Sequence, residues 1–527
     1  MGKKTSLKDM PSFSQNENKN DSDNWSNNSQ ILPGPSSLPF IGNLHQIRDP
    51  MHIAFNQMST KYGPIFKIKL GPQVYAIIND DKIVDDLVIR GGAIYFSSSS
   101  HYIPKETLPR DSEIAPYGTY WRTMHSLTRR AITRYIVNTH YQNIIHREVR
   151  NFMYRLYQTS SGPTDPTDDL KICILNVLAT ITYGSRSELT APTFKRFYNS
   201  LAESYSMDAN SKITGAFPWL SRTPSSVRKH KSRELKARKR LTDTAKELIV
   251  DLQQRVTTEK ERQHCFAAQI LRSIRKNNDR GITVQQLYEE IDHQTFDEYD
   301  SLHLIAMFLF GGTGAVTCQQ RWIFAQLSYL PKEQYKIQRE LYSLIGQGNY
   351  PSPKDYARLP YLRAVIRECL RFRPLGYFTV PHAIPVDDVY RGYHIPAKST
   401  MLVNTNPLHF SSALWDRPKR FIPERFLDAN GQLKQFKNDW EDPWVWCKGP
   451  QGCIGKELAE RMLCTIVAYT LTYFTIQREI DPKTGQPFEL NMKGEAYGLD
   501  LSAPSNFNLK FVPRAGIKFD ELLRVDL

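Results

Sequence analysis

One cysteine of this chain lies in a glycine-rich loop directly before a segment with the pattern of an amphipathic helix. The loop spans residues 446–455 and contains Cys453, and the predicted helix starts at Lys456. The exposed N–H groups and the positive dipole end of a helix N-terminus favour the thiolate form of a cysteine placed there. Three loop residues lack a Cβ atom, so the backbone can turn tightly and lie against a flat cofactor: Gly449, Gly452 and Gly455. The pattern suits a sulfur that ligates haem iron, because a thiolate ligand donates electron density that favours O–O cleavage.

The loop resembles the haem-binding segment of the cytochrome P-450 superfamily (eukaryotic, fungal type), whose pattern is F-x-x-G-x-R-x-C-x-G. Gly449, Cys453 and Gly455 match this pattern. Trp446 stands in place of the phenylalanine, and Gln451 in place of an arginine that pairs with a haem propionate. The resemblance implies that Cys453 is the axial thiolate ligand of haem b, with Trp446 and Gln451 beside the cofactor. The loss of the arginine predicts weaker haem retention or a shifted reduction potential.

A second cysteine, Cys447, is the rival ligand, but no glycine pattern surrounds it in the matching register. The alternative interpretation of the segment is a loop with two buried thiols and no cofactor. The chain has seven cysteines without C-x-x-C spacing, which fits a reducing compartment better than a disulfide scaffold.

Two further segments are expected to hold this loop in place. Glu368 and Arg371 are three residues apart in a predicted helix, which puts opposite charges on one helix face. The surrounding residues 359–374 resemble the K helix of the family, and residues 423–426 resemble its P-E-R-F segment. The resemblance implies that Arg425 closes a buried network with Glu368 and Arg371, whose role is to scaffold the haem loop.

Other segments resemble the parts of the family that bind the haem carboxylates. Residues 117–122 look like the start of its C helix, in which Trp121 and a basic residue four positions later grip a propionate. That later position holds His125, whose charge is only partial near neutral pH. By the same resemblance, Arg122 and His382 also bind propionates. The alternative for the first segment is a core tryptophan with basic residues on the surface.

Residues 302–317 predict an apolar helix that contains three glycines, each of which costs about 1 kcal/mol relative to alanine. The resemblance implies that Gly311 and Gly312 widen the groove in which dioxygen lies on the iron. The family then places an acid and a threonine that relay protons, and here those positions hold Gly314 and Ala315. We therefore expect Gly312 and Ala315 to line the oxygen site, with protons coming from ordered water or from a substrate hydroxyl.

Two threonines flank Ala315 but are in the wrong helical phase to replace the missing relay. Thr313 and Thr317 each lie about 200° around the helix from Ala315. We expect both to face away from the oxygen unless the glycines distort the helix.

The family pattern runs continuously from about residue 32 to residue 518 of the 527. The expected fold class is mainly α (α+β), with a large helical domain and a smaller β-rich part. Strands are predicted at 62–70, 74–78 and 378–381 and near the C-terminus. Residues 1–30 predict a disordered polar tail, and residues 31–527 a single haem-thiolate oxygenase domain.

The N-terminal residues bear on where the protein is located. No run of about 18 uncharged apolar residues is present that could span a membrane. Residues 1–6 match the N-myristoylation pattern, although one acyl chain binds membranes only marginally. Residues 32–43 resemble the proline-rich hinge that opens the domain in the family. We expect a protein that is cytoplasmic or peripheral on the cytosolic face of a membrane.

The net charge of +15 raises the question of an acidic partner. The densest basic run, 228–240, lacks zinc spacing or a recognition-helix signal, so we expect a solvated helix face and no nucleic acid. The resemblance implies that several basic residues lie on the proximal side of the haem and form a patch for docking an NADPH-dependent flavoprotein reductase: Arg129, Arg130, Arg134 and Lys448.

These observations together predict a haem-thiolate monooxygenase that oxidises a small lipophilic molecule with O2 and reductase-supplied electrons. By resemblance the substrate pocket comes from residues 97–116, 201–220, 375–383 and 501–507, and the protein is expected to be a monomer. The alternatives are a haem-thiolate isomerase, dehydratase or peroxide-driven enzyme without the relay, or a non-catalytic haem-binding relative.

Overall fold

The computed structural model describes residues 30–48, 50–89, 119–184, 298–346, 348–379, 381–436, 442–449, 452–497, 501–505 and 507–517, with Phe519 and single residues between 196 and 267. Helices dominate it and the strands form small sheets, which confirms the predicted fold class. Residues 1–29 of the predicted polar tail lie outside the described residues, and so does the predicted myristoylation segment, whereas Gln30 already forms a short strand with Ile31.

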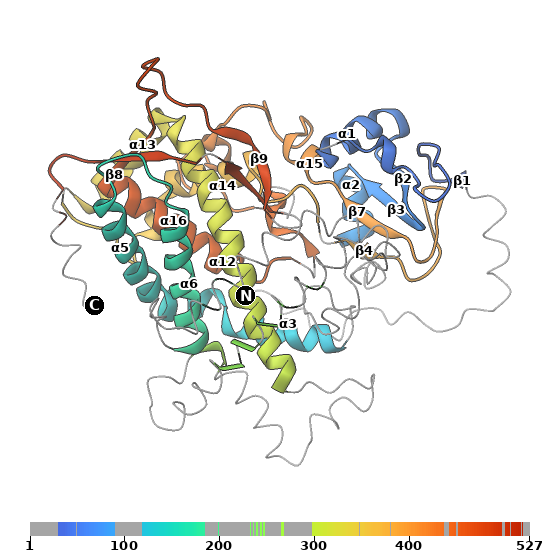
Figure 1. Ribbon diagram of the computed structural model, residues 1–527, viewed down its shortest axis with the longest axis horizontal. Coiled ribbons are helices and arrows are strands. Elements are labelled where there is room, and N and C mark those ends of the chain that lie inside the picture. The colour runs from blue at the N-terminus through green and yellow to red at the C-terminus, as the bar shows by residue number, and fades with distance from the viewer. Residues whose placement is uncertain are drawn as a thin grey trace, which may run out of the picture.

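The helical part is built around one long central helix. Helix α12 (Glu298–Ser328) runs through it and packs against α6 (Thr167–Tyr183), with α16 (Lys456–Tyr473) and α14 (Pro360–Phe372) also touching it (Figure 1). Helix α5 (Gln142–Gln158) packs against both α6 and α16. Apolar side chains of α5, α6, α12, α14 and α16 form one buried cluster, so these helices share a core.

The remaining helices are shorter or lie at the edge of this core. They are α1 (Met51–Tyr62), α2 (Asp81–Val84), α3 (Thr119–Ala131), α4 (Arg134–Ile136), α13 (Pro331–Ile345) and α15 (Asn406–Phe410). Two short turns of 3₁₀ helix matter for the site, η8 (Pro423–Phe426) and η10 (Trp444–Trp446).

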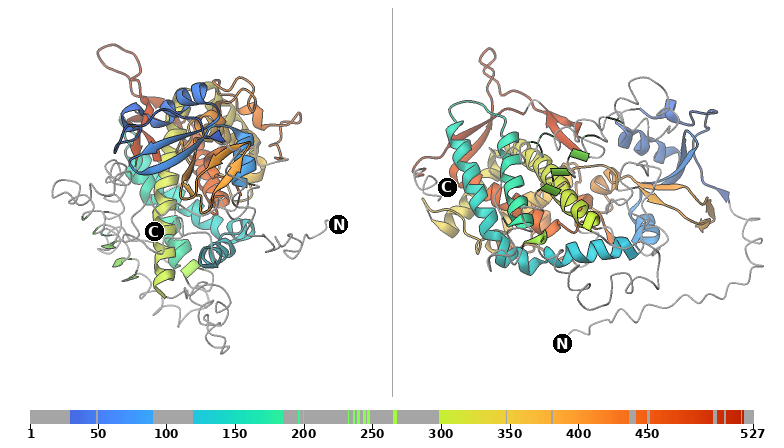
Figure 2. Two further views of the ribbon diagram at one scale, coloured as in Figure 1. Left: turned by 90° about the vertical axis from the view of Figure 1, so that its right-hand side faces the viewer. Right: turned by 60° about the horizontal axis from the view of Figure 1, so that its bottom comes forward.

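A four-stranded sheet lies at the opposite end of the molecule from α5 (Figures 1 and 2). Its order is β2 (Ile65–Leu70), β3 (Gln73–Ile78), β7 (Thr400–Val403) and β4 (His382–Ala383). β3 pairs in parallel with β7, and the other two pairs are antiparallel. The hairpin β2–β3 confirms the two strands predicted near residues 62–78.

Three smaller sheets complete the β structure. β1 (Gln30–Ile31), β6 (Tyr393–Ile395) and β5 (Asp388–Tyr390) form one, and the two near the C-terminus pair β8 (Phe474–Arg478) with β11 (Leu509–Pro513) and β9 (Asn491–Tyr497) with β10 (Leu501–Ser505). The strand predicted at 378–381 differs from the structure. Phe378 makes only an isolated bridge to Asn404, and the strand β4 begins later, at His382.

Candidate active site

The loop that carries Cys453 is closed on itself by backbone hydrogen bonds. The N–H of Cys453 donates to the carbonyl of Trp446 at 2.8 Å, and the N–H of Gly452 donates to the carbonyl of Gly449 at 3.0 Å. Helix α16 begins three residues after the cysteine, at Lys456. The predicted arrangement, a cysteine in a tight loop at a helix N-terminus, is therefore present in the structure.

Among the seven cysteines, all of which the structure describes, only Cys453 is exposed. Five are buried, and burial raises the pKa of Cys318 and of Cys464 to about 12, so these two stay protonated at neutral pH. The rival Cys447 is half-buried and has a φ of 52°, a conformation that favours glycine. Exposure and position therefore both favour Cys453 as the reactive thiol.

Two tryptophans of η10 fix the start of the loop in two different cores. Trp444 is buried in the cluster formed by the four-stranded sheet, beside residues such as Ile384 and Met401. Trp446 is buried in the helical cluster, which also contains Leu458 of α16. The indole Nε1 of Trp446 is buried and has no hydrogen-bond partner among the described residues.

The basic residues near the loop do not all lie on the surface. Lys448 is only 7% exposed, its ammonium donates to the carbonyl of Asp442 at 2.8 Å, and it lies over the Trp444 ring. The expectation that Lys448 belongs to a docking patch is therefore wrong, because its charge is used inside the loop. Lys456 also pairs with the Asp442 carboxylate. By contrast, Arg129 and Arg130 of α3 are exposed, and the Arg134 side chain is 73% exposed with a long 3.8 Å contact to Glu457.

The predicted network around Glu368 is present, and the Glu368 carboxylate at its centre is fully buried. Arg371 donates to both oxygens of the Glu368 carboxylate, at 2.7 and 2.8 Å, and Arg425 donates to the same two oxygens at 3.1 and 3.2 Å. The side chains of Glu368 and Arg371 are 0% exposed. The carboxylate also accepts the N–H of Ile422 at 2.8 Å. Because removal of one partner would leave an uncompensated buried charge, the network rigidly ties α14 to the segment of η8.

The residues predicted to bind propionates are placed differently from one another. Trp121 is buried on α3 and stacks on His125, with ring centroids 4.6 Å apart. Burial and the nearby Arg129 charge lower the pKa of His125, so this ring is largely neutral at pH 7. Arg122 is exposed on the same helix. Gln451 lies outside the described residues.

His382 is the anchor candidate whose surroundings leave a polar atom unsatisfied. It lies in β4, is 3% exposed, and its Nδ1 has no hydrogen-bond partner among the described residues. Burial lowers its pKa to about 4. A buried unsatisfied ring nitrogen is costly, and a carboxylate ligand would satisfy it and favour its proton.

Helix α12 is continuous through its three glycines. Thr313 and Thr317 are buried, and the Thr317 hydroxyl donates to the Thr313 carbonyl at 2.7 Å, whereas Ala315 is half-buried. The helix is not distorted, so the two threonines lie on the side away from Ala315.

A Cβ added to Gly312 would lie 2.7 Å from Leu178 Cδ1 of α6. Gly312 therefore allows α6 and α12 to pack closely, a contact that sequence patterns gave no reason to expect.

These residues fit a haem held by one thiolate. Cys453 supplies an exposed sulfur at a helix N-terminus. Two nitrogens in segments that resemble the family's haem-binding motifs, His382 Nδ1 and Trp446 Nε1, are buried and have no hydrogen-bond partner among the described residues, so each could bind a polar group of the cofactor. On α3, Arg122 is exposed and His125 is largely neutral, so Arg122 supplies the positive charge of this pair of candidate carboxylate ligands.

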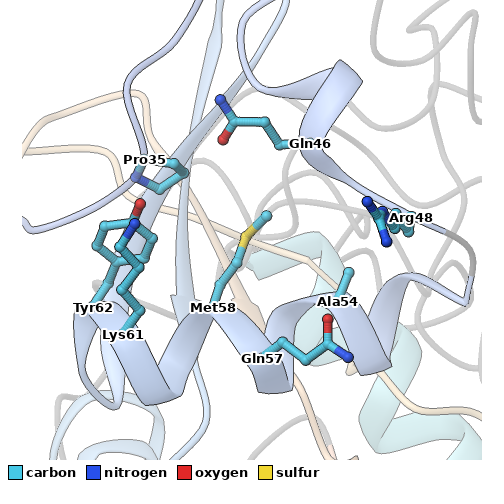
Figure 3. A pocket seen from close by; sticks show the side chains of 8 residues that line it. All are labelled: Pro35, Gln46, Arg48, Ala54, Gln57, Met58, Lys61 and Tyr62. Atoms are coloured by element: carbon cyan, nitrogen blue, oxygen red, sulfur yellow. The ribbon is translucent and has the colours of Figure 1, made fainter.

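An open surface pocket of about 230 Å³ lies away from these residues (Figure 3). It is formed by α1 and the proline-rich segment before it, and its lining residues are Pro35, Gln46, Arg48, Ala54, Gln57, Met58, Lys61 and Tyr62. None of the predicted site residues lines it.

No helix among the described residues is long and apolar enough to cross a bilayer.

Residues 32–499 match the family model described as Cytochrome P-450. The monooxygenase fogE of Aspergillus ruber, named as a cytochrome P-450, is 26% identical over 92% of this chain and 87% of its own length. The steroid 17-alpha-hydroxylase/17,20 lyase of Ictalurus punctatus is 27% identical over 84% of this chain and 85% of its own length. The monooxygenase claR of Ampulloclitocybe clavipes, also named as a cytochrome P-450, is 24% identical over 94% and 88%.

Proposed function

The chain belongs to the cytochrome P-450 family and is a monooxygenase of that type, and from this premise we propose that Cys453 is the axial ligand of its haem b. The observation that carries this proposal is the position of Cys453, the exposed cysteine of a closed loop at the N-terminus of α16. When bound, the haem supplies the iron at which dioxygen is reduced and one oxygen atom is transferred to substrate.

The surrounding residues hold that group and shape its two faces. The Cys453 sulfur would ligate the iron and supply electron density to it, and Trp446 would lie beside the cofactor. His382 and Trp121 with His125 would bind the propionates, and Arg122 would add a positive charge near them. The Glu368 network holds α14 against the segment of η8. In this proposal Gly311, Gly312 and Ala315 line the oxygen side, and Gly312 also allows α12 to pack closely on α6.

A second candidate function has one observation in its favour. The positions for the proton-relaying acid and alcohol hold Gly314 and Ala315 in an undistorted helix, and both nearby threonines lie on its other side. An isomerase, a dehydratase or a peroxide-driven enzyme needs no such relay.

The substrate is proposed to be a lipophilic small molecule. The described part of the predicted pocket contributes apolar and aromatic side chains, among them Leu375, Tyr377, Phe378 and Phe507. Residues 97–116 and 201–220 lie outside the described residues. The steroid named for one group of relatives belongs to the same broad chemical class.

We further propose a reductase and a membrane surface as contacts of this monomer. The exposed basic face of α3, with Arg129 and Arg130, and Arg134 on α4 fit an acidic NADPH-dependent flavoprotein reductase. The segment from β1 to α1 exposes several large apolar side chains: Ile31, Leu38, Phe40, Ile41, Leu44 and Ile53. These side chains support peripheral contact on the cytosolic face of a membrane. The basic run 228–240, mostly outside the described residues, is still expected to be a solvated face that binds no nucleic acid.

The deciding experiment compares Cys453→Ser with Cys447→Ser as the matched control. The wild type and Cys447→Ser are expected to show the red-shifted absorption band of thiolate-ligated iron after reduction and carbon monoxide treatment, and Cys453→Ser is expected to lose it. A band that survives in Cys453→Ser contradicts the proposal.

Turnover then separates the candidate activities. With a reductase and NADPH, product-linked NADPH consumption supports the monooxygenase. Turnover driven by peroxide alone supports the second candidate.

A further inference from the structure

A buried histidine connects the Glu368 network to the loop that carries Cys453. His409 lies in α15 and is fully buried. Its backbone carbonyl accepts a hydrogen bond from Arg371 Nη1 at 2.7 Å. Its ring Nε2 accepts the backbone N–H of Trp444 at 2.9 Å. One residue therefore contacts both the guanidinium of the network and the first residue of η10.

The ring of His409 is neutral and is held at an energetic cost. Burial, together with the charges of Arg371 and Lys448, lowers its pKa to about 3. Because Nε2 is the acceptor, the proton of the neutral ring is on Nδ1, which is buried without a hydrogen-bond partner among the described residues. A phenylalanine would fill similar space without an unsatisfied N–H. The histidine is therefore best explained by the acceptor that it offers to Trp444.

Two backbone hydrogen bonds carry the position of Trp444 forward to the cysteine. The Trp444 carbonyl accepts the N–H of Cys447 at 3.0 Å, which closes the η10 turn. The Trp446 carbonyl accepts the N–H of Cys453 at 2.8 Å. A shift of Trp444 would therefore also shift Trp446, and with it Cys453, whose N–H the Trp446 carbonyl accepts.

We propose that His409 is a positioning residue for the thiolate, which fixes the Cys453 loop by accepting the Trp444 N–H. The inference rests on the proposed role of Cys453 as iron ligand. It does not require His409 to touch haem, substrate or oxygen.

The test uses substitutions that separate the acceptor from the packing. His409→Phe removes the acceptor but keeps a ring. His409→Gln keeps an amide oxygen near the place of Nε2, whereas His409→Asn puts it near the place of Nδ1. Trp415→Phe is the matched control, because it removes another buried hydrogen bond of α15, from Trp415 Nε1 to the Leu408 carbonyl at 2.9 Å, without touching the haem loop.

The measurement is the reduced, carbon monoxide-treated spectrum of each haem-loaded protein, alongside its thermal midpoint. Relative to wild type, we expect the ratio of thiolate-ligated to other haem to fall about tenfold in His409→Phe and His409→Asn, with His409→Gln and Trp415→Phe near wild type, since an unsatisfied N–H shifts an equilibrium by that order. If His409→Phe does not fold, the Gln and Asn pair alone decides the outcome.

Two results would overturn the inference: equal band ratios in the Gln and Asn variants, or a loss in Trp415→Phe as large as in His409→Phe. Either would show that α15 contributes only general stability. A wild-type protein without the thiolate band would instead refute the role of Cys453, so the two failures are distinguishable.

Discussion

Replacement of Gly312 by alanine tests whether this glycine serves helix packing. The added Cβ would lie 2.7 Å from Leu178 Cδ1, well inside the 3.5–4.0 Å at which carbon atoms make favourable contacts. Leu178 is 1% exposed, so its side chain has little room to move. Overpacking of this kind costs about 1–3 kcal/mol, and alanine regains about 1 kcal/mol of helix propensity over glycine. We expect Gly312→Ala to lower the free energy of unfolding by about 1 kcal/mol.

The same substitution should have the opposite sign once Leu178 is shortened. Leu178→Ala alone is expected to cost about 2–5 kcal/mol because it leaves a cavity. In that background the clash is gone and the helix propensity remains, so Gly312→Ala should stabilise the protein by about 1 kcal/mol. Urea unfolding of the four haem-loaded proteins forms a double-mutant cycle whose coupling energy measures the contact. Equal destabilisation by Gly312→Ala in both backgrounds would refute the packing explanation.

Three further predictions concern the relay, the hinge and a buried histidine. Ala315→Thr restores an alcohol at the oxygen site and should raise product formed per NADPH and lower peroxide release, and unchanged values for both would argue against the missing relay. Phe40 is 90% exposed, so Phe40→Ser should weaken co-sedimentation with anionic lipid vesicles several-fold at unchanged stability, whereas Phe488→Ser, at a position 45% exposed on another segment, should not. Burial lowers the pKa of His146 from its usual 6.5 to about 4, so the stability that its neutral ring contributes is present above pH 6.5 and is lost as the pH falls to about 4. The free energy of unfolding of His146→Gln, measured by urea titration, should therefore vary less with pH in that window than that of wild type, by up to about 3 kcal/mol, and parallel profiles would contradict this.

The parts of the site that sequence could predict are those encoded by local spacing. The loop around Cys453 and the i, i+3 pair of Glu368 and Arg371 are short patterns, and both appear in the structure with the expected geometry. The third member, Arg425, was expected only through resemblance, since more than fifty residues separate it from Glu368. Its hydrogen bonds to the carboxylate confirm that expectation.

The contacts that sequence could not predict join residues that no periodicity relates. Nothing near Gly312 indicates that Leu178 of α6 lies against it. Lys448 is of a residue type that usually lies on the surface, and only the fold shows its contacts with Asp442 and Trp444. Exposure of a lysine is the usual outcome, so its burial here becomes visible only once the loop has been placed between two cores.

This placement also bears on the weak carboxylate anchors. With a neutral His125 and with Gln451 in place of an arginine, the proposed contacts to the propionates would contribute less to fixing the haem than the family pattern implies. The loop, however, is fixed by the protein itself: Trp444 lies in the sheet core, Trp446 lies in the helical core, and His409 accepts the N–H of Trp444. A metal-ligating side chain that is already held in position loses less conformational entropy when the cofactor binds. We therefore attribute retention of haem in this chain more to the preformed geometry of the thiolate loop than to charges around the propionates.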